Sequence, residues 1–161
     1  MNASCEQDEK FHKLISKYSA RIIRIAFTYV KNMADAEDIA QDVFLAYLTA
    51  NVLFLSEEHD KAWLIRVTVN KSKNYIKAHW FRERTPLPED LSYLPEEENE
   101  ALSAVLELDV KYRLPIHLFY YESYSLKEIA DILHTNPATI GTRLARARAI
   151  LKKKLGGIDY E

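Results

Sequence analysis

Six cationic side chains and no acidic one occur between residues 137 and 154, near the end of a chain of 161 residues. They are Arg143, Arg146, Arg148, Lys152, Lys153 and Lys154. Such groups neutralise phosphates, and a guanidinium can also donate two hydrogen bonds to the edge of a guanine. The alternative is a solvated helix end whose cations complement the helix dipole. A solvated face normally mixes both signs, so the pattern favours nucleic-acid binding.

Two short helices must position these cations. Ser125 and Glu128 have the spacing of a capping box, which predicts a first helix that runs to about residue 133. Asn136 and Pro137 predict the start of a second, because Asn accepts free amide protons and Pro in the first turn loses no intrahelical bond. Since only two residues separate the helices, the segment predicts a helix-turn-helix.

The second helix has two distinct faces. Its apolar residues recur at helical spacing and are expected to pack inward: Ile140, Leu144, Ala147 and Leu151. The opposite face carries Thr142, Ala145, Arg146 and Ala149. This outer face is small and basic, which suits the major groove of a duplex.

The net charge is only −2, but the charge lies in blocks. Residues 61–84 hold seven Lys or Arg and one acid, whereas residues 86–109 hold eight acids and no base. A Pro- and Glu-rich composition resists burial and favours an extended linker. We therefore expect an all-α chain of two small helical domains, residues 1–84 and 101–161, joined by an acidic flexible linker at residues 85–100.

The N-terminal domain is predicted to contain a long amphipathic helix, with apolar residues three or four apart from residue 11 to residue 29. A second helix over residues 35–48 is expected to bury Ala36, Ile39, Ala40, Val43, Phe44 and Tyr47. Its other face carries Glu37, Asp38, Gln41 and Asp42. Acids in a first turn are also favoured by the helix dipole alone, so this face has a purely structural interpretation as well.

Catalysis finds little support in the sequence. The five His are scattered without metal-ligand spacing, and there is no phosphate-binding Gly-rich loop or nucleophile motif. We therefore expect no catalytic residue, metal or cofactor, and we expect His117 to be a core residue. The single Cys5, the lack of a signal peptide and an apolar run at 43–55 too short to span a bilayer predict a cytoplasmic protein without membrane insertion.

Three motifs in a fixed order resemble bacterial sigma factors of the extracytoplasmic-function (ECF) group. They are the D-A-E-D-I-A-Q-D-V-F helix at residues 35–44, the W-L-I-R-V-x-x-N-K-x-K-N segment at residues 63–74, and the helix-turn-helix after an acidic linker. The resemblance covers residues 11 to 155. It implies that the N-terminal domain is the family's region 2, which binds core RNA polymerase and opens the minus-ten element. The C-terminal domain would be region 4, which reads the minus-thirty-five element.

The resemblance carries roles onto individual residues. It places the polymerase contact on Glu37, Asp38, Gln41 and Asp42. It places minus-ten contacts on Asn70, Lys71, Lys73, Asn74, Lys77, Trp80 and Arg82. It places minus-thirty-five contacts on Asn136, Thr139, Thr142, Arg143, Arg146, Arg148 and Lys152, with Thr142 and Arg146 facing bases. Residues 53–61 match the loop that captures a flipped base in this family.

Elementary chemistry agrees with these roles. The amides of Asn70 and Asn74 can pair with base edges, and the cations beside them can neutralise phosphates. Trp80 and Phe81 could stack on unpaired bases, although core packing is an equal alternative for Trp80 and the preferred one for Trp63.

The sequence departs from the family at three places, two where the family commonly has Gly and one where it often has Lys or Arg. His134 and Thr135 occupy the helix-turn-helix turn where the family commonly has Gly, and Ser123 replaces a Gly before the first helix. We expect left-handed strain at the turn. Gly141 stands where the family often has Lys or Arg, which removes a charge and lowers helix propensity by roughly 1 kcal/mol relative to Ala.

Two other functions remain open at this point. A dimeric operator-binding regulator needs only the helix-turn-helix and a dimerisation surface, but it leaves the Asn70 and Asn74 pair without a role. A sigma-like interaction protein would bind polymerase or an inhibitor without directing initiation. The resemblance itself implies core RNA polymerase and promoter DNA as partners, together with an anti-sigma factor that could be membrane-anchored.

Overall fold

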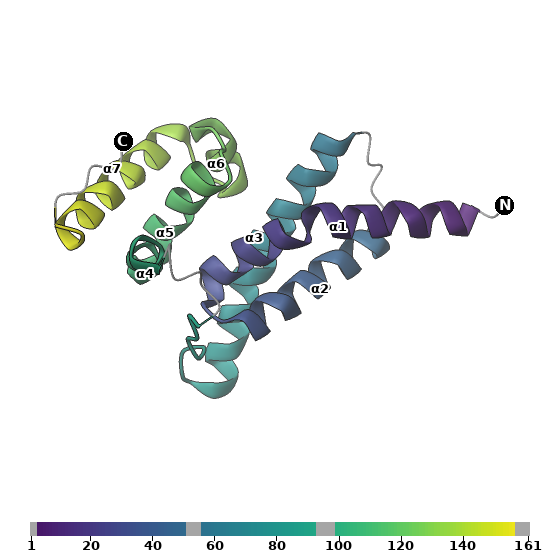
Figure 1. Cartoon of the computed structure of the whole chain (residues 1–161), viewed down its shortest axis with the longest axis horizontal. Coiled ribbons are helices and arrows are strands. Elements are labelled where there is room, and N and C mark those ends of the chain that lie inside the picture. Colours follow the sequence, from purple (N-terminus) through teal and green to yellow (C-terminus); the bar gives the residue numbers. More distant parts are fainter. Residues whose placement is uncertain (1–2, 51–55, 93–98, 157–161) are drawn as a thin grey trace. The chain divides into compact units, whose positions relative to one another are not determined.

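The computed structural model describes residues 3–50, 56–92 and 99–156, and every regular element in these ranges is a helix (Figure 1). The chain divides into two compact units, residues 1–87 and residues 88–161. The expected all-α class is thereby confirmed. Residues 93–98 of the predicted linker lie outside the described residues. Residues 85–92 of the predicted linker contain no helix, whereas residues 99 and 100 already belong to the helix Asn99–Glu107, so the linker ends earlier than predicted.

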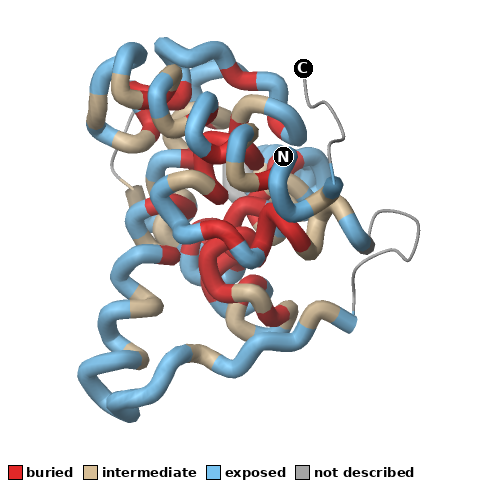
Figure 2. The backbone as a smooth tube through the Cα atoms, turned by 90° about the vertical axis from the view of Figure 1, so that its left-hand side faces the viewer, coloured by how far each residue is buried: buried red, intermediate tan, exposed pale blue. Residues whose placement is uncertain are grey.

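Three long helices make up the first unit: α1 (Ala3–Val30), α2 (Met33–Thr49) and α3 (Glu57–Glu83). Each helix packs against the other two. The core holds the fully buried Ile22, Ile25 and Ile39 of the predicted stripes together with Leu64 and Ile65 of α3, and the backbone at such positions is red in Figure 2. Helix α1 begins at Ala3, earlier than the apolar stripe predicts. The stripe does not reveal its first two turns, because they are mostly polar and, where described, exposed.

Tyr47 departs from the prediction that the inner face of α2 is buried throughout. The other five residues of that face are buried, whereas Tyr47 is half-buried. Its ring contacts Trp63 edge-to-face at 5.7 Å between centroids, and its hydroxyl donates to Asp60 Oδ1 at 3.2 Å. The hydroxyl needs a polar partner, so the ring lies at the border of the core rather than inside it.

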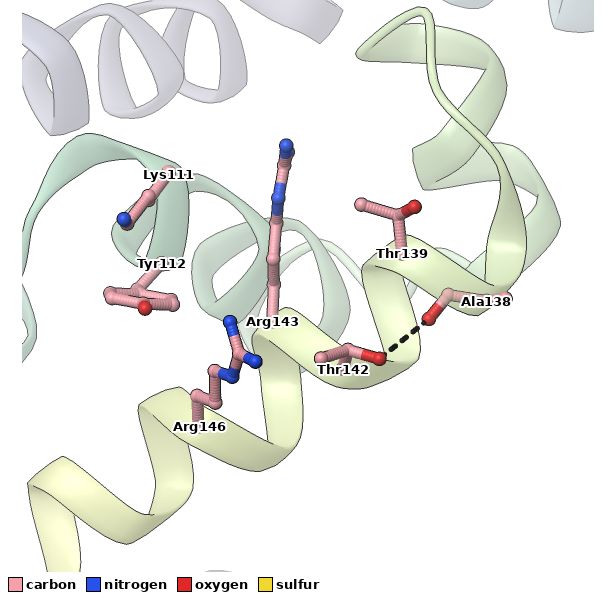
Figure 3. Close-up of a pocket in the computed structure, with 7 residues that line it drawn as sticks. All are labelled: Lys111, Tyr112, Ala138, Thr139, Thr142, Arg143 and Arg146. Atoms are coloured by element: carbon pink, nitrogen blue, oxygen red, sulfur yellow. Dashed lines mark hydrogen bonds between the residues drawn. The ribbon is translucent and has the colours of Figure 1, made fainter.

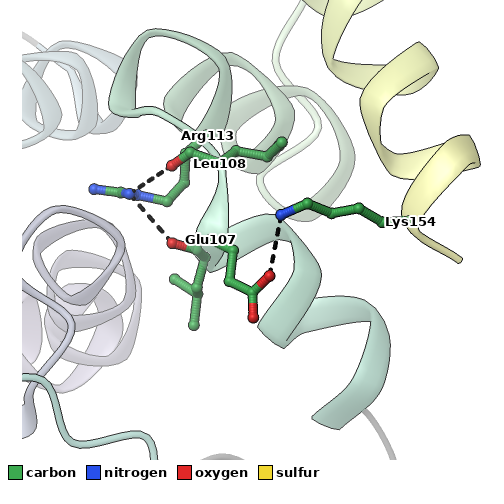
Figure 4. Close-up of polar contacts among 5 residues, drawn as sticks. Glu107, Leu108, Arg113 and Lys154 are labelled. Atoms are coloured by element: carbon green, nitrogen blue, oxygen red, sulfur yellow. Dashed lines mark hydrogen bonds and ion pairs between the residues drawn. The ribbon is translucent and has the colours of Figure 1, made fainter.

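The second unit contains α4 (Asn99–Glu107), α5 (Val110–Ile116), a π-helical turn η2 (His117–Tyr121), α6 (Leu126–Ile132) and α7 (Pro137–Lys154). Arg113 closes the corner between α4 and α5 (Figure 4). Its buried guanidinium donates to the carbonyl oxygens of Leu106 at 3.3 Å and Leu108 at 2.8 Å. Leu106 lies in the last turn of α4 and Leu108 directly follows the helix, where carbonyls lack an intrahelical donor, so the cation satisfies acceptors that would otherwise be orphaned.

The prediction that His117 is a core residue is confirmed, since 5 % of its surface is exposed. It opens the π-helical turn, where the Glu122 N–H donates to the His117 carbonyl at 3.2 Å. The His117 ring stacks on Tyr121, and its Nε2 lies 3.3 Å from Oε1 of the buried Glu122. The pair joins the turn to the start of the segment that leads into α6.

Candidate nucleic-acid interface

Both predicted helix starts of the helix-turn-helix are confirmed. Ser125 Oγ accepts from the Glu128 N–H at 3.1 Å, and Glu128 Oε1 accepts from the Ser125 N–H at 3.1 Å, which completes the capping box of α6. Asn136 Oδ1 accepts from the Thr139 N–H at 2.9 Å at the start of α7, and Pro137 lies in its first turn. Local hydrogen bonds therefore fix where each helix of the pair begins.

The backbone is left-handed at both positions where this chain lacks the glycine of the family. His134, in the turn between α6 and α7, has φ +55°, and Ser123, before α6, has φ +60°. A side chain in this conformation costs an L-residue roughly 1–2 kcal/mol. The expected strain at the helix-turn-helix turn is confirmed, and the structure adds a second strained position at Ser123.

Helix α7 presents the two faces expected from the sequence. Its four apolar residues are buried: Ile140, Leu144, Ala147 and Leu151. The opposite residues are all exposed: Thr142, Ala145, Arg146 and Ala149. Gly141 lies between these faces, and a Cβ added to it would meet no atom within 4 Å.

The two threonine hydroxyl groups at the start of α7 already donate their protons in hydrogen bonds. Thr139 Oγ1 donates to Asn136 Oδ1 at 3.0 Å, and Thr142 Oγ1 donates to the Ala138 carbonyl at 3.1 Å (Figure 3). In this state each hydroxyl offers only its lone pairs, while the Thr142 methyl remains available for an apolar contact. Thr142 is therefore suited to accept a hydrogen bond from a base amino group or to contact a thymine methyl.

A cavity of about 440 Å³ opens on this face of the second unit (Figure 3). Five of its lining residues belong to α7: Ala138, Thr139, Thr142, Arg143 and Arg146. The other two, Lys111 and Tyr112, come from the first turn of α5. Sequence reasoning missed this pair because α5 lies outside the helix-turn-helix. The available signal was Lys111 itself, the first base after the acidic block.

Arg148 and the lysines at the end of α7 have mixed surroundings. The Arg148 Nε donates to the Tyr120 hydroxyl at 2.7 Å, and its guanidinium lies 5.6 Å from the Tyr120 ring centroid. Lys154 Nζ pairs with Glu107 Oε2 at 3.0 Å (Figure 4), and both Lys152 and Lys154 are exposed. Part of the charge expected to face phosphates thus holds α7 against neighbouring elements of its own unit.

The minus-ten candidates all lie on α3. Four exposed side chains, Asn70, Lys73, Asn74 and Lys77, follow the i, i+3, i+4, i+7 spacing of a single helix face. Lys71 is half-buried, and Arg82 Nε lies 3.3 Å from Glu83 Oε1. The stripe combines amide groups with cations, which is a combination suited to base edges and backbone phosphates.

Two aromatic residues continue this surface at the end of α3. Trp80 is 48 % exposed and Phe81 is 68 % exposed, so neither is packed in the core. Trp63, in contrast, is half-buried against Tyr47, so it packs at the border of the core. Of the expected base-capturing loop, residues 53–55 lie outside the described residues. Ser56 caps the start of α3 through the His59 N–H at 3.1 Å.

The outer face of α2 is acidic and then apolar. Its four expected polar residues are exposed: Glu37, Asp38, Gln41 and Asp42. Leu45 and Leu48 continue the same face and are 58 % and 55 % exposed. Sequence reasoning missed these two leucines because they lie within an apolar run. A partner that covered this face would gain apolar burial as well as charge contacts.

A polar contact between distant residues fixes α2 against α3. The Tyr75 hydroxyl donates to Asp35 Oδ1 at 2.6 Å, and the Asn32 side-chain amide donates to Asp35 Oδ2 at 2.6 Å. Burial and the hydrogen bond to Asp35 hold the pKa of Tyr75 well above its usual value. Asp35 therefore does more than complement the helix dipole, because it joins the start of α2 to the middle of α3.

The described residues contain no group of His, Cys, Asp or Glu side chains that could hold a metal ion. In the same ranges, no helix is long and apolar enough to cross a bilayer.

Comparison with known families matches both units. The model of Sigma-70 region 2 matches residues 14–82, and that of Sigma-70 region 4 matches residues 98–151. The ECF RNA polymerase sigma factor SigW of Bacillus subtilis is 28 % identical over 91 % of this chain and 89 % of its own length. The ECF RNA polymerase sigma-E factor of Haemophilus influenzae is 29 % identical over 90 % and 87 %.

Solved structures have the same fold. The sigma factor RpoE of Bartonella quintana, crystallised with the anti-sigma factor NepR, matches with a TM-score of 0.77 at 20 % identity over 94 % of this chain and 99 % of its own. CnrH in complex with the cytosolic domain of CnrY matches with a TM-score of 0.69 at 22 % identity over 94 % and 91 %. With regions 2 and 4 in order on one chain and ECF relatives aligned over most of its length, the protein belongs to the ECF subfamily of RNA polymerase sigma factors.

Proposed function

We propose that this protein is a dissociable initiation subunit, not itself an enzyme, that binds core RNA polymerase and directs it to promoters with a minus-ten and a minus-thirty-five element. The observation that carries the proposal is the presence of both sigma regions on one chain, each with an exposed surface of amide or cationic side chains. An operator-binding regulator requires only the second of these regions, so it leaves the α3 stripe without a ligand.

Region 4 supplies the minus-thirty-five contacts in this proposal. Arg146 is exposed on the outer face of α7 and donates to a base edge, and Thr142 accepts or makes a methyl contact. Arg143 binds a phosphate at the edge of the cavity that α7 forms with α5, and Lys152 binds another phosphate farther along α7. Asn136 and Thr139 contribute by fixing the start of the helix. Arg148 contributes only through donors that Tyr120 does not engage.

Region 2 supplies the minus-ten and polymerase contacts. Asn70 and Asn74 read base edges from one face of α3, where the neighbouring lysines neutralise phosphates. Trp80 stacks on an unpaired base, which its exposure allows. The acidic face of α2, centred on Asp38 and Gln41, binds polymerase together with the exposed Leu45.

A protein inhibitor and a cytoplasmic location complete the proposal. Two proteins of this fold have solved structures with protein partners, an anti-sigma factor in one case and the cytosolic domain of CnrY in the other. We infer that an anti-sigma factor holds this chain inactive until a signal releases it.

The acidic linker, about 15 residues long, could extend to roughly 50 Å and so allow the two domains to reach separate promoter elements.

Selection of DNA by the assembled holoenzyme tests the proposal. Core polymerase with and without this protein is incubated with a random duplex library, and the retained fragments are sequenced. We expect two short sequence blocks at a constant spacing that appear only when both proteins are present. A single palindrome selected by this protein without polymerase would instead establish an operator-binding regulator.

A further inference from the structure

The cavity on the outer face of α7 has a wall that the helix-turn-helix does not supply. Lys111 and Tyr112 form this wall from α5, which packs directly against α7. Figure 3 shows both side chains on one side of Arg143, with Thr139 and Thr142 on the other side. The exposed surface at the outer face of α7 therefore includes residues of α5 as well as those of α7.

The described lining of this cavity is cationic. It contains Lys111, Arg143 and Arg146 but no carboxylate. Lys111 is exposed, and its Nζ lies 5.0 Å from the centroid of the Tyr112 ring, a distance at which the ring attracts the ammonium. Tyr112 thus limits the positions that a long, flexible side chain adopts at the edge of the cavity.

The hydrogen-bond donors of the cavity favour an anion. The hydroxyl protons of Thr139 and Thr142 are already donated within α7. A phosphate oxygen is only an acceptor, so its partners in this cavity are the ammonium of Lys111, the guanidinium groups of the arginines and the hydroxyl of Tyr112.

We propose that Lys111 binds a backbone phosphate of the duplex whose major groove receives α7. The major groove is about 12 Å wide, and a helix with its side chains is about 10–12 Å across. A helix that enters the groove therefore brings elements beside its outer face close to the phosphate rows that border the groove. The inference rests on the proposed function, and it extends the minus-thirty-five surface from the helix-turn-helix to α5, with Tyr112 as a positioning residue.

The salt dependence of binding tests this contact. The holoenzyme is titrated with a duplex selected as above and with an unrelated duplex, using wild type, Lys111→Ala, Lys111→Arg and the control Lys10→Ala from α1, which is also exposed. A phosphate contact contributes about 0.9 to the slope of log K against log salt, or roughly eightfold in affinity at 0.1 M salt. We expect Lys111→Ala to lose about this much on both duplexes, and Lys111→Arg and Lys10→Ala to retain it.

Neutral phosphates locate the contact. Methylphosphonates are placed one at a time along the selected duplex, and one position should weaken wild type while leaving Lys111→Ala unchanged. The inference would be overturned if Lys111→Ala showed the wild-type slope of log K against log salt. It would also be overturned if every methylphosphonate weakened the binding of wild type and of Lys111→Ala equally. The wild-type preference for the selected duplex separates the two proposals: if it is absent, both fail, and if it is present while Lys111→Ala keeps the wild-type salt slope, only the Lys111 contact fails.

Discussion

Replacing His134 with glycine should stabilise the second unit. His134 is exposed and has φ +55°, a conformation that costs an L-residue roughly 1–2 kcal/mol but is free of this strain for glycine. Glycine also gains freedom in the unfolded chain, which costs about 0.4–1 kcal/mol. The difference predicts that His134→Gly raises the free energy of unfolding by about 0.5–1 kcal/mol.

The assay must report on the correct unit. Both tryptophans, Trp63 and Trp80, belong to the first unit, so their fluorescence is insensitive to this change. Amide hydrogen exchange within α7 reports on the second unit, and we expect its slowest amides to exchange about two- to fivefold more slowly. For a domain of this size the melting temperature should rise by about 2–8 °C.

The control is glycine at the next residue. Thr135 does not have a positive φ, so Thr135→Gly relieves no strain, brings the entropic cost and the loss of a half-buried side chain, and should lower the stability of the same unit. If both substitutions destabilise α7 equally, the strain assigned to His134 is absent and the reasoning is refuted.

Three further changes probe other parts of the chain. Gly141→Ala should stabilise α7 by about 1 kcal/mol, because the added methyl meets no atom within 4 Å, and slower hydrogen exchange in α7 checks this. Arg146→Ala should reduce discrimination between selected and mismatched duplexes by about 1–3 kcal/mol in competition binding, and a uniform loss on all duplexes would contradict its base-reading role. Burial, followed by the charge of Asp60, raises the pKa of Tyr47 to about 12. The protonated phenol is thus favoured by folding, so its contribution to stability is complete below pH 10 and is lost as pH rises towards 12. Tyr47→Phe should make the alkaline fall in stability shallower, as followed by tryptophan fluorescence, and an unchanged pH dependence would contradict this assignment.

The features that could be predicted from sequence are those that neighbouring residues determine. The capping box at Ser125 and the cap at Asn136 involve residues three apart, so they can be read directly and they define both helices of the pair. The faces of α2 and α7 follow from helical periodicity for the same reason. The left-handed turn at His134 was predicted because a short connection in this motif commonly uses glycine.

The features that were missed depend on contacts between distant residues. Lys111 borders the cavity only because α5 packs on α7, and the contact between Arg148 and Tyr120 joins residues 28 apart. The hydrogen bond between Tyr75 and Asp35 spans 40 residues. Residue type does not identify the two partners of such a contact, since an exposed lysine or a half-buried tyrosine is compatible with many partners.

Transcription with purified components tests the central claim most directly. Core RNA polymerase is supplied with promoter fragments recovered by the selection, with this protein, with Arg146→Ala or with no addition, and the transcripts are counted over many rounds. We predict initiation that requires this protein, starts downstream of both sequence blocks and falls with Arg146→Ala on fragments that retain the minus-thirty-five block. Stable binding of the protein to core polymerase without transcripts from any fragment would contradict the claim that it is an initiation subunit.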